Sequence, residues 1–298
     1  MTSDDRLAVV MITRNRKDRA RRAVAGLVAL PERPHVVVVD NGSSDRTAAA
    51  LQAEFPQVEV VAAGGNLGAA GRTLGAQRVT APYVAFCDDD MAWQPGALGQ
   101  AADIFDPHPT VAVVAARVLV GPDGREDPTC RAMADSPLPP RDGLYGLDGR
   151  RVLGFVAGAA VVRRDAFLAV GGFEPRLVIG GEEELLALDL AAAGWQLLYV
   201  PDVVVRHTPN TRRATTWPGR WQFRNRLWVC WLRRPAGLVL RRTASLVVEG
   251  GRQTFGGLLR AVAGLPWIVR ARRPVPSAVA RDLELLSGAD LMPHDPVA

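Results

Sequence analysis

Cysteine is scarce in this chain of 298 residues, which contains only Cys87, Cys130 and Cys230. The three lie far apart, their number is odd, and no CxxC pair occurs. This pattern argues against a disulfide framework and against a zinc site, and it fits a reducing cytoplasm.

Long apolar runs are also missing. No stretch reaches about 18 uninterrupted apolar residues, so we expect no transmembrane helix. The N-terminus, MTSDDRLAVVMIT, has no basic segment before an apolar core, so we expect no signal peptide. With 48% hydrophobic and 22% charged residues, the composition is that of a globular protein. The length suits one large α/β domain, or one domain with an appendage.

Acidic residues are nearly absent from a long stretch near the C-terminus. Between Arg206 and Arg273 there are fifteen arginines and one acid, Glu249, which gives this stretch a net charge of +14. Because the whole chain carries +5, the remainder carries −9. An acidic body joined to an Arg-rich, apolar tail indicates that the tail contacts something anionic. Anionic lipid is the natural candidate, and nucleic acid is the other.

The first ninety residues consist of strand–helix units. Four apolar runs are unbroken and rich in β-branched residues, as is typical of parallel strands covered on both faces: 7–13, 35–40, 58–63 and 83–90. In open α/β sheets, ligands bind beyond the carboxyl ends of the strands. We therefore expect one set of residues to converge at that edge: Thr13, Asp40, Gly64–Asn66 and Asp88–Asp90.

The rest of the body is less regular. We expect helices at 96–105 and 182–195, strands at 111–120 and 196–207, and a strand, a turn and a helix within 152–173. Residues 121–150 are rich in Pro, Gly and Asp, and we interpret them as a mobile loop over the site.

The fourth run ends in three adjacent carboxylates, Asp88, Asp89 and Asp90. Adjacent like charges are costly unless a cation or hydrogen-bond donors lie between them. On an extended strand end the first and third side chains point the same way, and Mg²⁺ and Mn²⁺ prefer such oxygen ligands. For the triplet alone, a solvated turn is the simpler alternative.

Four pieces of the chain occur in a characteristic order: VVVVDNGSSD, GGNLGAAGRTLGA, FCDDD and GGFEPRLVIGGEEELLALDLAAAGWQLLYVPDVVVRH. Together they resemble the family 2 glycosyltransferases with the GT-A fold, especially the rhamnosyltransferase-like members. The resemblance implies a Rossmann-like, mixed and mostly parallel α/β sheet flanked by helices in residues 1–215. A basic, amphipathic helical extension would follow in residues 216–298.

The resemblance also implies the chemistry. A nucleotide sugar would donate a sugar to an acceptor hydroxyl on a glycan, a lipid or a natural product, with inversion at the anomeric carbon. The diphosphate leaving group develops negative charge, which suits a bridging divalent cation, Mn²⁺ or Mg²⁺. By the family pattern, Asp90 is the direct metal ligand, and Asp88 contacts the ribose or, through water, the metal. Asp89 belongs to the donor side without a defined contact. His207 completes the metal shell, although a lone histidine after a strand is more often structural.

Further donor contacts are carried over from the family. Asp40 would accept a hydrogen bond from the nucleobase imide, with a turn or helix-capping carboxylate as the alternative. Thr13 and Arg14 would line the base and the ribose. Asn66 and Arg72 lie on the glycine-rich turn and the helix that follows, where phosphate contacts fit. UDP-, dTDP- and GDP-sugars all suit Asp40, because each base has an imide-type N–H.

The acidic helix departs from the family text. The usual G-E-D-x-D-L is replaced here by GEEELL at residues 181–186. Glu183 takes the catalytic-base position, while Leu185 replaces the second acid and puts the function of that acid in doubt. Three further residues are expected on the acceptor side: Trp93, Gly158 and Glu182.

The tail interleaves aromatic residues, leucine and arginine from Trp217 onward. Trp221, Trp228 and Trp231 share one broad face flanked by Arg224 and Arg234. An interfacial helix on an anionic membrane and a core-packing or dimerising helix both fit this pattern. Nucleic acid is disfavoured as a partner, because no nucleic-acid-binding module accompanies the basic residues.

Two other functions share parts of the pattern. A nucleotidyltransferase that makes NDP-sugars carries a glycine-rich basic loop after its first strand, whereas TRNRKDRA at this place has no glycine. A non-catalytic nucleotide-sugar-binding protein is supported by Leu185 alone. We therefore expect a cytoplasmic glycosyltransferase, and we leave open peripheral binding to the inner face of the membrane and a homodimer.

Overall fold

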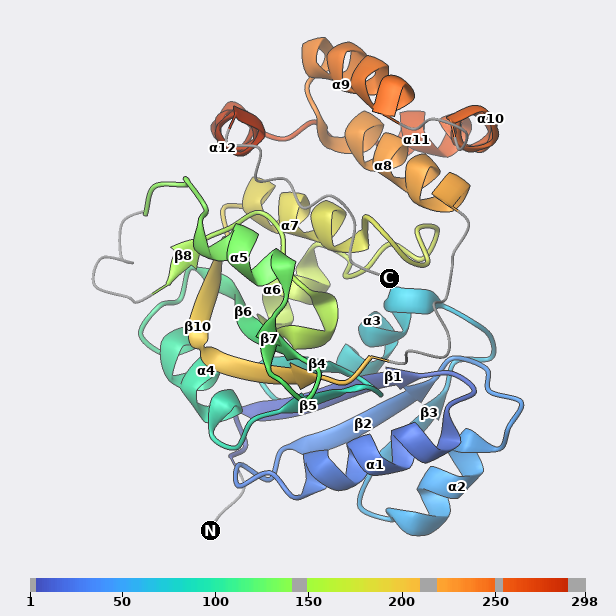
Figure 1. The fold of residues 1–298 in the computed structure, drawn as a ribbon, viewed down its shortest axis with the longest axis vertical. Coiled ribbons are helices and arrows are strands. Elements are labelled where there is room, and N and C mark those ends of the chain that lie inside the picture. Colours follow the sequence, from blue (N-terminus) through green and yellow to red (C-terminus); the bar gives the residue numbers. More distant parts are fainter. Residues whose placement is uncertain (1–3, 141–148, 210–218, 250–253, 289–298) are drawn as a thin grey trace.

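The computed structural model describes residues 4–140, 149–209, 219–249 and 254–288. A ten-stranded sheet runs through the body, and a layer of helices caps one end of the molecule (Figure 1). The sheet has the order β3-β2-β1-β4-β9-β6-β10-β5, and β7 and β8 pair with β6 and β10. The strands are β1 (Leu7–Thr13), β2 (His35–Asp40), β3 (Glu59–Ala62), β4 (Tyr83–Asp88), β5 (Met91–Trp93), β6 (Val111–Val120), β7 (Arg125–Glu126), β8 (Arg150–Arg151), β9 (Ala160–Arg163) and β10 (Gln196–His207).

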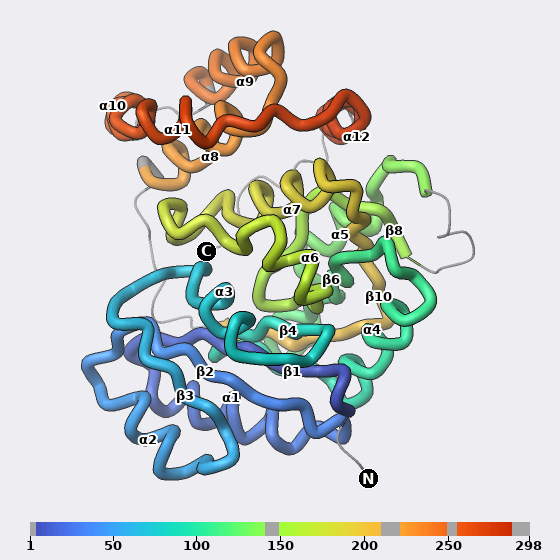
Figure 2. The backbone as a smooth tube through the Cα atoms, turned by 180° about the vertical axis from the view of Figure 1, so that it is seen from behind, coloured from blue at the N-terminus to red at the C-terminus, as the bar shows by residue number. Residues whose placement is uncertain are grey.

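The strands β1 to β4 form a parallel half of the sheet. Their apolar runs are buried, as the unbroken sequence pattern predicted. Helices α1 (Lys17–Val28) and α2 (Thr47–Glu54) lie on one face, and α3 (Gly71–Ala76) lies on the other (Figures 1 and 2). Right-handed crossovers account for this change of side, because the chain runs outward from β1 to β3 and returns beyond β1 as β4.

The second half of the sheet is mixed, and the long pairing of β6 with β10 is parallel. Directly after the acidic triplet the chain turns back as β5, a strand that the sequence did not predict. β5 pairs antiparallel with the end of β10, and Met91 lies opposite His207. This pairing brings the end of β10 close to the end of β4.

Part of the expected loop at 121–150 is folded, so that prediction was wrong for the described residues. The stretch contains β7, the helix α5 (Pro128–Ala134) and the start of β8. Asp127 caps α5 by accepting a hydrogen bond from the Thr129 amide at 2.8 Å. Asp at the N-cap and Pro in the first turn both favour a helix start, so residues that suggested a loop here begin a helix. Residues 141–148 lie outside the described residues.

The helices at the C-terminal end enclose a second hydrophobic core, distinct from the core that covers the sheet. Helix α7 (Glu182–Ala192) belongs to both, because Leu186 and Leu190 enter the first core while Leu185 and Leu188 enter the second. The remaining helices are α4 (Ala97–Phe105), α6 (Arg164–Ala169), α8 (Gly219–Arg233), α9 (Ala236–Glu249), α10 (Thr254–Ala263), α11 (Leu265–Ala271) and α12 (Ser277–Gly288). The domain boundary at 215/216 stays a prediction, since it lies outside the described residues.

The aromatic face of α8 packs against its neighbouring helices, with Trp228 buried and Trp221 and Trp231 half-buried. Trp228 is buried in the second core, and its indole N–H donates a hydrogen bond to the Ala261 carbonyl at 3.0 Å. Its ring meets Trp267 edge to face. Arg224 is buried against the rings of Trp221 and Trp228, 4.5 and 4.1 Å from their centroids. This geometry favours the core-packing alternative for α8. None of the described helices has the length and apolar character needed to cross a membrane.

Candidate active site

The carboxyl ends of β1, β2 and β4 lie side by side. In the parallel pairings, Thr13 is opposite Asp40, and Ile12 is opposite Asp88. These strand ends meet where the order of the strands reverses, which is the position at which open α/β sheets bind ligands. Arg14 follows β1 directly, and its side chain is exposed at this edge. The structure therefore brings the expected donor-side residues of the first strands together.

Two of the expected donor-side residues are fixed by backbone amides. The Oδ1 atom of the buried Asp40 accepts a hydrogen bond from the Ser43 amide at 2.8 Å. The exposed Asn66 accepts a hydrogen bond from the Gly68 amide at 3.1 Å. These bonds hold both side chains in defined positions on the turns after β2 and β3, as an Asx-type turn does.

Asp89 is turned into the protein. Its Oδ2 accepts a hydrogen bond from the Thr13 hydroxyl at 2.7 Å, and its Oδ1 pairs with Arg16 at 2.8 Å. Burial raises the pKa of Asp89, while Arg16 and the Thr13 hydroxyl act in the opposite direction. Asp89 and Thr13 thus bind each other and join the ends of β1 and β4.

Asp90 faces the opposite strand end. Its Oδ1 lies 3.7 Å from Nε2 of His207, and its backbone carbonyl accepts a hydrogen bond from the Thr208 amide at 2.8 Å. The approach follows from the β5–β10 pairing, which sets Met91 opposite His207. One carboxylate and one imidazole therefore meet at the sheet edge, although they are 117 residues apart in the chain.

Two arginines that the sequence analysis did not single out complete this cluster. Arg16 lies 3.1 Å and Arg19 lies 3.5 Å from Oδ2 of Asp90. Both belong to the stretch RNRKDR after β1, and their spacing of three places them on one side of the first turn of α1. The run of basic residues after a strand end was the available signal. Its charge explains how three adjacent carboxylates are tolerated.

Asp88 pairs with the buried Arg72, whose guanidinium donates to Oδ1 of Asp88. The Nε atom of Arg72 is buried and has no hydrogen-bond partner among the described residues. On the other side of the carboxylate, Gly158 approaches so closely that a Cβ atom there would lie 2.6 Å from Oδ2 of Asp88. Gly158, an expected acceptor-side residue, therefore packs directly against the acidic triplet.

The three glutamates at the start of α7 have different environments. Glu182 is buried, and its Oε2 has no hydrogen-bond partner among the described residues. Burial, reinforced by the charge of Glu183, raises the pKa of Glu182 to about 8. Burial also raises the pKa of Glu183, and the nearby charge of Arg72 opposes this rise. Glu184 points toward the C-terminal helices and pairs with Arg234 at 3.4 Å.

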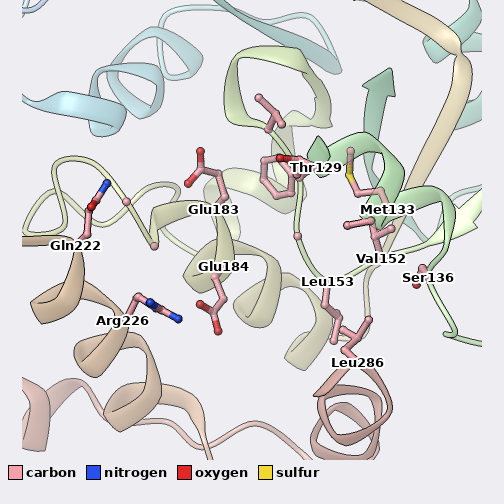
Figure 3. A pocket seen from close by; sticks show the side chains of 16 residues that line it. Thr129, Met133, Ser136, Val152, Leu153, Glu183, Glu184, Gln222, Arg226 and Leu286 are labelled. Atoms are coloured by element: carbon pink, nitrogen blue, oxygen red, sulfur yellow. The ribbon is translucent and has the colours of Figure 1, made fainter. Parts of the chain in front are cut away.

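A cavity of about 220 Å³ opens beside Glu183 (Figure 3). Glu183 and Glu184 enter it from α7, Gln222 and Arg226 from α8, and Leu286 from α12. The opposite wall is mainly apolar and consists of Thr129, Ala132, Met133, Ser136 and the segment 152–156. The sequence analysis missed this cavity. It had interpreted α5 as part of a loop, and α8 and α12 as a separate tail.

Trp93 does not line this cavity. It is buried in the core of the sheet, where its indole N–H donates a hydrogen bond to the Phe86 carbonyl at 3.1 Å. In the β5–β10 pairing it lies opposite Val205. The structure thus gives Trp93 a packing position. Gly158 and Glu182 do not line the cavity either: Gly158 packs against Asp88, and Glu182 is buried beside Glu183.

The fit of a divalent cation can be judged from the donor set. No group of three or more His, Cys, Asp or Glu side chains surrounds a single metal position in the described parts of the chain. Asp90 and His207 present one carboxylate and one imidazole at 3.7 Å. Mg²⁺ commonly binds through one or two carboxylates and completes its shell with substrate phosphates and water. The pair fits a cation that is held jointly by the protein and a diphosphate.

The acidic triplet, the buried Arg72 and the acidic start of α7 lie together at the strand ends of a mixed α/β sheet, the architecture of the GT-A fold. The mannosyltransferase PcManGT from Pyrobaculum calidifontis, solved in complex with GDP-Man and Mn²⁺, has the same fold, with a TM-score of 0.59. The match has 19% identity and covers 98% of this chain and 82% of that one. The expected fold class is confirmed.

Residues 8–171 match the family model described as Glycosyl transferase family 2, and the chain belongs to this family. It is 30% identical over 237 residues to the N-acetylglucosaminyl-diphospho-decaprenol L-rhamnosyltransferase of Mycobacterium tuberculosis, which is 68% of this chain and 76% of the relative. It is 31% identical over 269 residues to the pre-mycofactocin glycosyltransferase of the same species. That match covers 82% of this chain, but only half of the relative's length. The chain is thus a glycosyltransferase, and the nucleotidyltransferase alternative is not supported.

Proposed function

We propose that the protein is a metal-dependent, inverting glycosyltransferase that moves a sugar from a nucleotide diphosphate donor to an acceptor hydroxyl. The observation that carries this proposal is the position of Glu183. Its carboxylate lines the cavity, and it is close enough to Arg72 and Asp88 for their charges to act on it. Glu183 is therefore near both the acidic triplet, where the donor would bind, and the cavity, where the acceptor would bind.

The donor nucleotide is proposed to bind across the ends of β1, β2 and β4. Asp40 would accept the imide N–H of the base, and Thr13, Arg14 and Asp88 would line the base and ribose. Asn66 would contact the phosphates from the turn after β3. Arg72, whose buried Nε has no partner among the described residues, would donate a hydrogen bond to a phosphate oxygen. Arg16 and Arg19 add positive charge at the same edge.

Asp90 and His207 would hold Mn²⁺ or Mg²⁺, with Asp88 near it. When bound, such a cation neutralises the charge that develops on the departing diphosphate. The donor set supports this assignment, and so does the neighbour solved with GDP-Man and Mn²⁺.

Glu183 is the proposed general base. The acceptor oxygen forms a bond to the anomeric carbon on the face opposite the diphosphate, as the bond from that carbon to the diphosphate oxygen breaks. The hydroxyl proton passes to the Glu183 carboxylate, and the nucleoside diphosphate leaves as the anion. A raised pKa suits a base that must accept a proton near neutral pH.

The acceptor is proposed to combine an apolar part with an anionic group. The cavity wall is mainly apolar, and Arg226 supplies a positive charge on the side that also carries Glu183 and Glu184. The M. tuberculosis rhamnosyltransferase is named for a lipid-linked sugar diphosphate, which combines the same two properties. We propose the cytoplasm as the compartment, since all three cysteines are free and buried.

A donor screen followed by a turnover assay tests the proposal. The protein is mixed with UDP-, dTDP- or GDP-sugars and Mn²⁺, and its melting temperature is measured. A ligand at 100 times its Kd stabilises by about 2.7 kcal/mol, so the correct donor stands out. Release of nucleoside diphosphate from that donor, stimulated by a polyprenyl-diphospho-sugar, is the expected result. Donor binding without transfer or hydrolysis would favour the non-catalytic binding protein instead.

A further inference from the structure

The outer faces of α9, α10 and α11 expose large apolar side chains. Leu240 is 77% exposed, Val248 83%, Phe255 75% and Val269 73%. Four more large hydrophobic residues on these helices are also exposed: Val247, Leu259, Val262 and Leu265. Ile179 and Leu285 are the other two such residues in the described parts of the chain. Exposed apolar surface is therefore concentrated at one end of the molecule.

The spacing of these residues produces continuous stripes. On α9, Leu240, Val247 and Val248 lie seven and eight positions apart, on one side of the helix, and Leu246 on the other side enters the second core. Across α10 and α11, Phe255, Leu259, Val262 and Val269 repeat with helical spacing. The opposite side of these two helices buries Ala261 and Ile268. Helices that face water normally carry polar residues on the outer side, and here that arrangement is reversed.

Arginine accompanies the apolar stripes, and acid does not. Arg241, Arg260 and Arg270 are exposed, and each directly follows an exposed apolar residue, Leu240, Leu259 or Val269. Glu249 is the single acid between Arg206 and Arg273. The surface thus combines apolar stripes with neighbouring cationic side chains, which is the composition of helices that lie in the interface of an anionic membrane.

We propose that the outer faces of α9, α10 and α11 dock on an anionic lipid bilayer. The apolar stripes would enter the acyl boundary, while the arginine stems extend along them and keep their guanidinium groups at the lipid phosphates. A second copy of the chain is a poorer partner. An isologous contact would bring arginines from both copies together, with few acids to neutralise them.

This surface differs from the one that the sequence suggested. Trp228 of α8 is buried, Trp221 and Trp231 are half-buried, and α8 lies between α9 and α7 (Figure 1). Gln222 and Arg226 of α8 form one wall of the cavity beside Glu183. Docking would therefore hold that cavity about one helix diameter, roughly 10 Å, from the lipid. The proposal concerns binding alone and does not depend on the transfer reaction.

Sedimentation with vesicles tests the proposal without any substrate. The full chain is incubated with vesicles of phosphatidylcholine alone or mixed with phosphatidylglycerol. We expect it to sediment with the anionic vesicles, to stay in solution with the neutral ones, and to be released as salt screens the attraction. Equal recovery with both kinds of vesicle, or recovery with neither, would overturn the proposal.

Matched variants locate the surface. The double substitution Phe255→Ser and Val269→Ser should weaken binding to anionic vesicles at least about tenfold, because two exposed apolar side chains are lost. Leu285→Ser, an exposed residue on α12, is the control and should bind as the wild type does. Arg241→Glu with Arg270→Glu should also abolish binding, whereas Arg22→Glu on α1 should not.

The melting temperatures of the variants show whether a loss of binding comes from misfolding. Their melting temperatures should match that of the wild type, since all the changed side chains are exposed. Unchanged vesicle binding by both double variants would overturn the proposal. A dimer that the Phe255/Val269 variant disrupts, in a protein that ignores anionic vesicles, would also overturn it and assign the surface to a second copy.

Discussion

Gly158 and Asp88 touch so closely that a Cβ atom at position 158 would lie 2.6 Å from Oδ2 of the aspartate. Such a contact is shorter than real Cβ atoms adopt, so a side chain there must displace the carboxylate or the segment before β9. The contact joins the segment before β9 to the acidic triplet. A side chain added at position 158 can therefore be used to test whether the position of Asp88 matters.

We predict that Gly158→Ala lowers kcat/KM at least about tenfold, since a misplacement of about 1 Å at a site can cost that much or more. Gly26→Ala in α1 is the control, because a Cβ atom there meets nothing within 4 Å. The control should keep full activity, and its stability should rise by up to about 1 kcal/mol. Steady-state kinetics and thermal melts of both variants check the prediction. An unchanged kcat/KM in Gly158→Ala would show that Asp88 can be displaced without loss of activity.

Glu183→Gln should lower transfer at least about a hundredfold, because it keeps the shape of the side chain and removes its basicity. Donor affinity should stay nearly unchanged, so the loss appears in kcat. For the wild type, kcat should fall as the pH drops below the raised pKa of Glu183. Glu184→Gln, which changes a residue paired with Arg234, should cost far less. The assignment would be wrong if Glu182→Gln, and not Glu183→Gln, abolished transfer.

Removal of the divalent cation should abolish transfer, and Asp90→Asn should have the same effect. The informative measurement is nucleotide binding with and without Mn²⁺, monitored through the shift in melting temperature. In the wild type Mn²⁺ should strengthen binding, whereas in Asp90→Asn and His207→Ala this gain should disappear. Asp165→Asn changes a carboxylate that is 90% exposed and should retain the gain. Full activity in excess EDTA would remove the metal from the mechanism.

The buried Glu182 predicts how stability depends on pH. Its pKa in the folded protein, about 8, lies above its ordinary value of 4.5, so folding favours the protonated form. The corresponding stability is fully present below about pH 4.5 and is lost as the pH rises through 8. One pKa unit corresponds to about 1.4 kcal/mol, so the loss should be easy to measure by denaturation. Glu182→Gln stays neutral and should remove most of the difference between pH 6 and pH 9. Identical pH profiles for both proteins would contradict this account.

Leu185→Asp restores the acid of the usual family text, and we predict that it destabilises the protein without raising activity. Leu185 is 5% exposed and belongs to the second core, where a carboxylate would be buried without a partner. Leu185→Met keeps the volume and should cost less than about 1.5 kcal/mol. Urea denaturation of the two variants separates the stability lost to a buried charge from the stability lost to a change of side-chain shape. A stable, more active Leu185→Asp would show that the missing acid limits the reaction.

The sequence predicted the parallel half of the sheet well, because its strands are unbroken apolar runs and their ends carry the polar residues. Thr13, Asp40 and the triplet converge for this reason. The position of β5 was not predictable in the same way, since Met91–Trp93 is too short to show any periodicity. Its pairing with β10 depends on a partner more than a hundred residues away.

Other errors have physical causes as well. The helix α5 was hidden because Asp127 and Pro128 are turn formers and helix starters alike. The tryptophans of α8 looked like an interfacial face, because periodicity shows that residues share a side without showing what covers it. Here α10 and α11 cover Trp228, and the exposed apolar side belongs to the neighbouring helices.

The membership of α7 in both cores has a consequence for any shortened form of the enzyme. A stop codon or a protease cut near residue 216 would uncover Leu185 and Leu188, which face the C-terminal helices. The helix that carries Glu183 would lose its outer support and present apolar side chains to water. We expect such a fragment to aggregate and to be inactive. We therefore expect the last eighty residues or so to be needed for a soluble enzyme, even in an assay that contains no membrane.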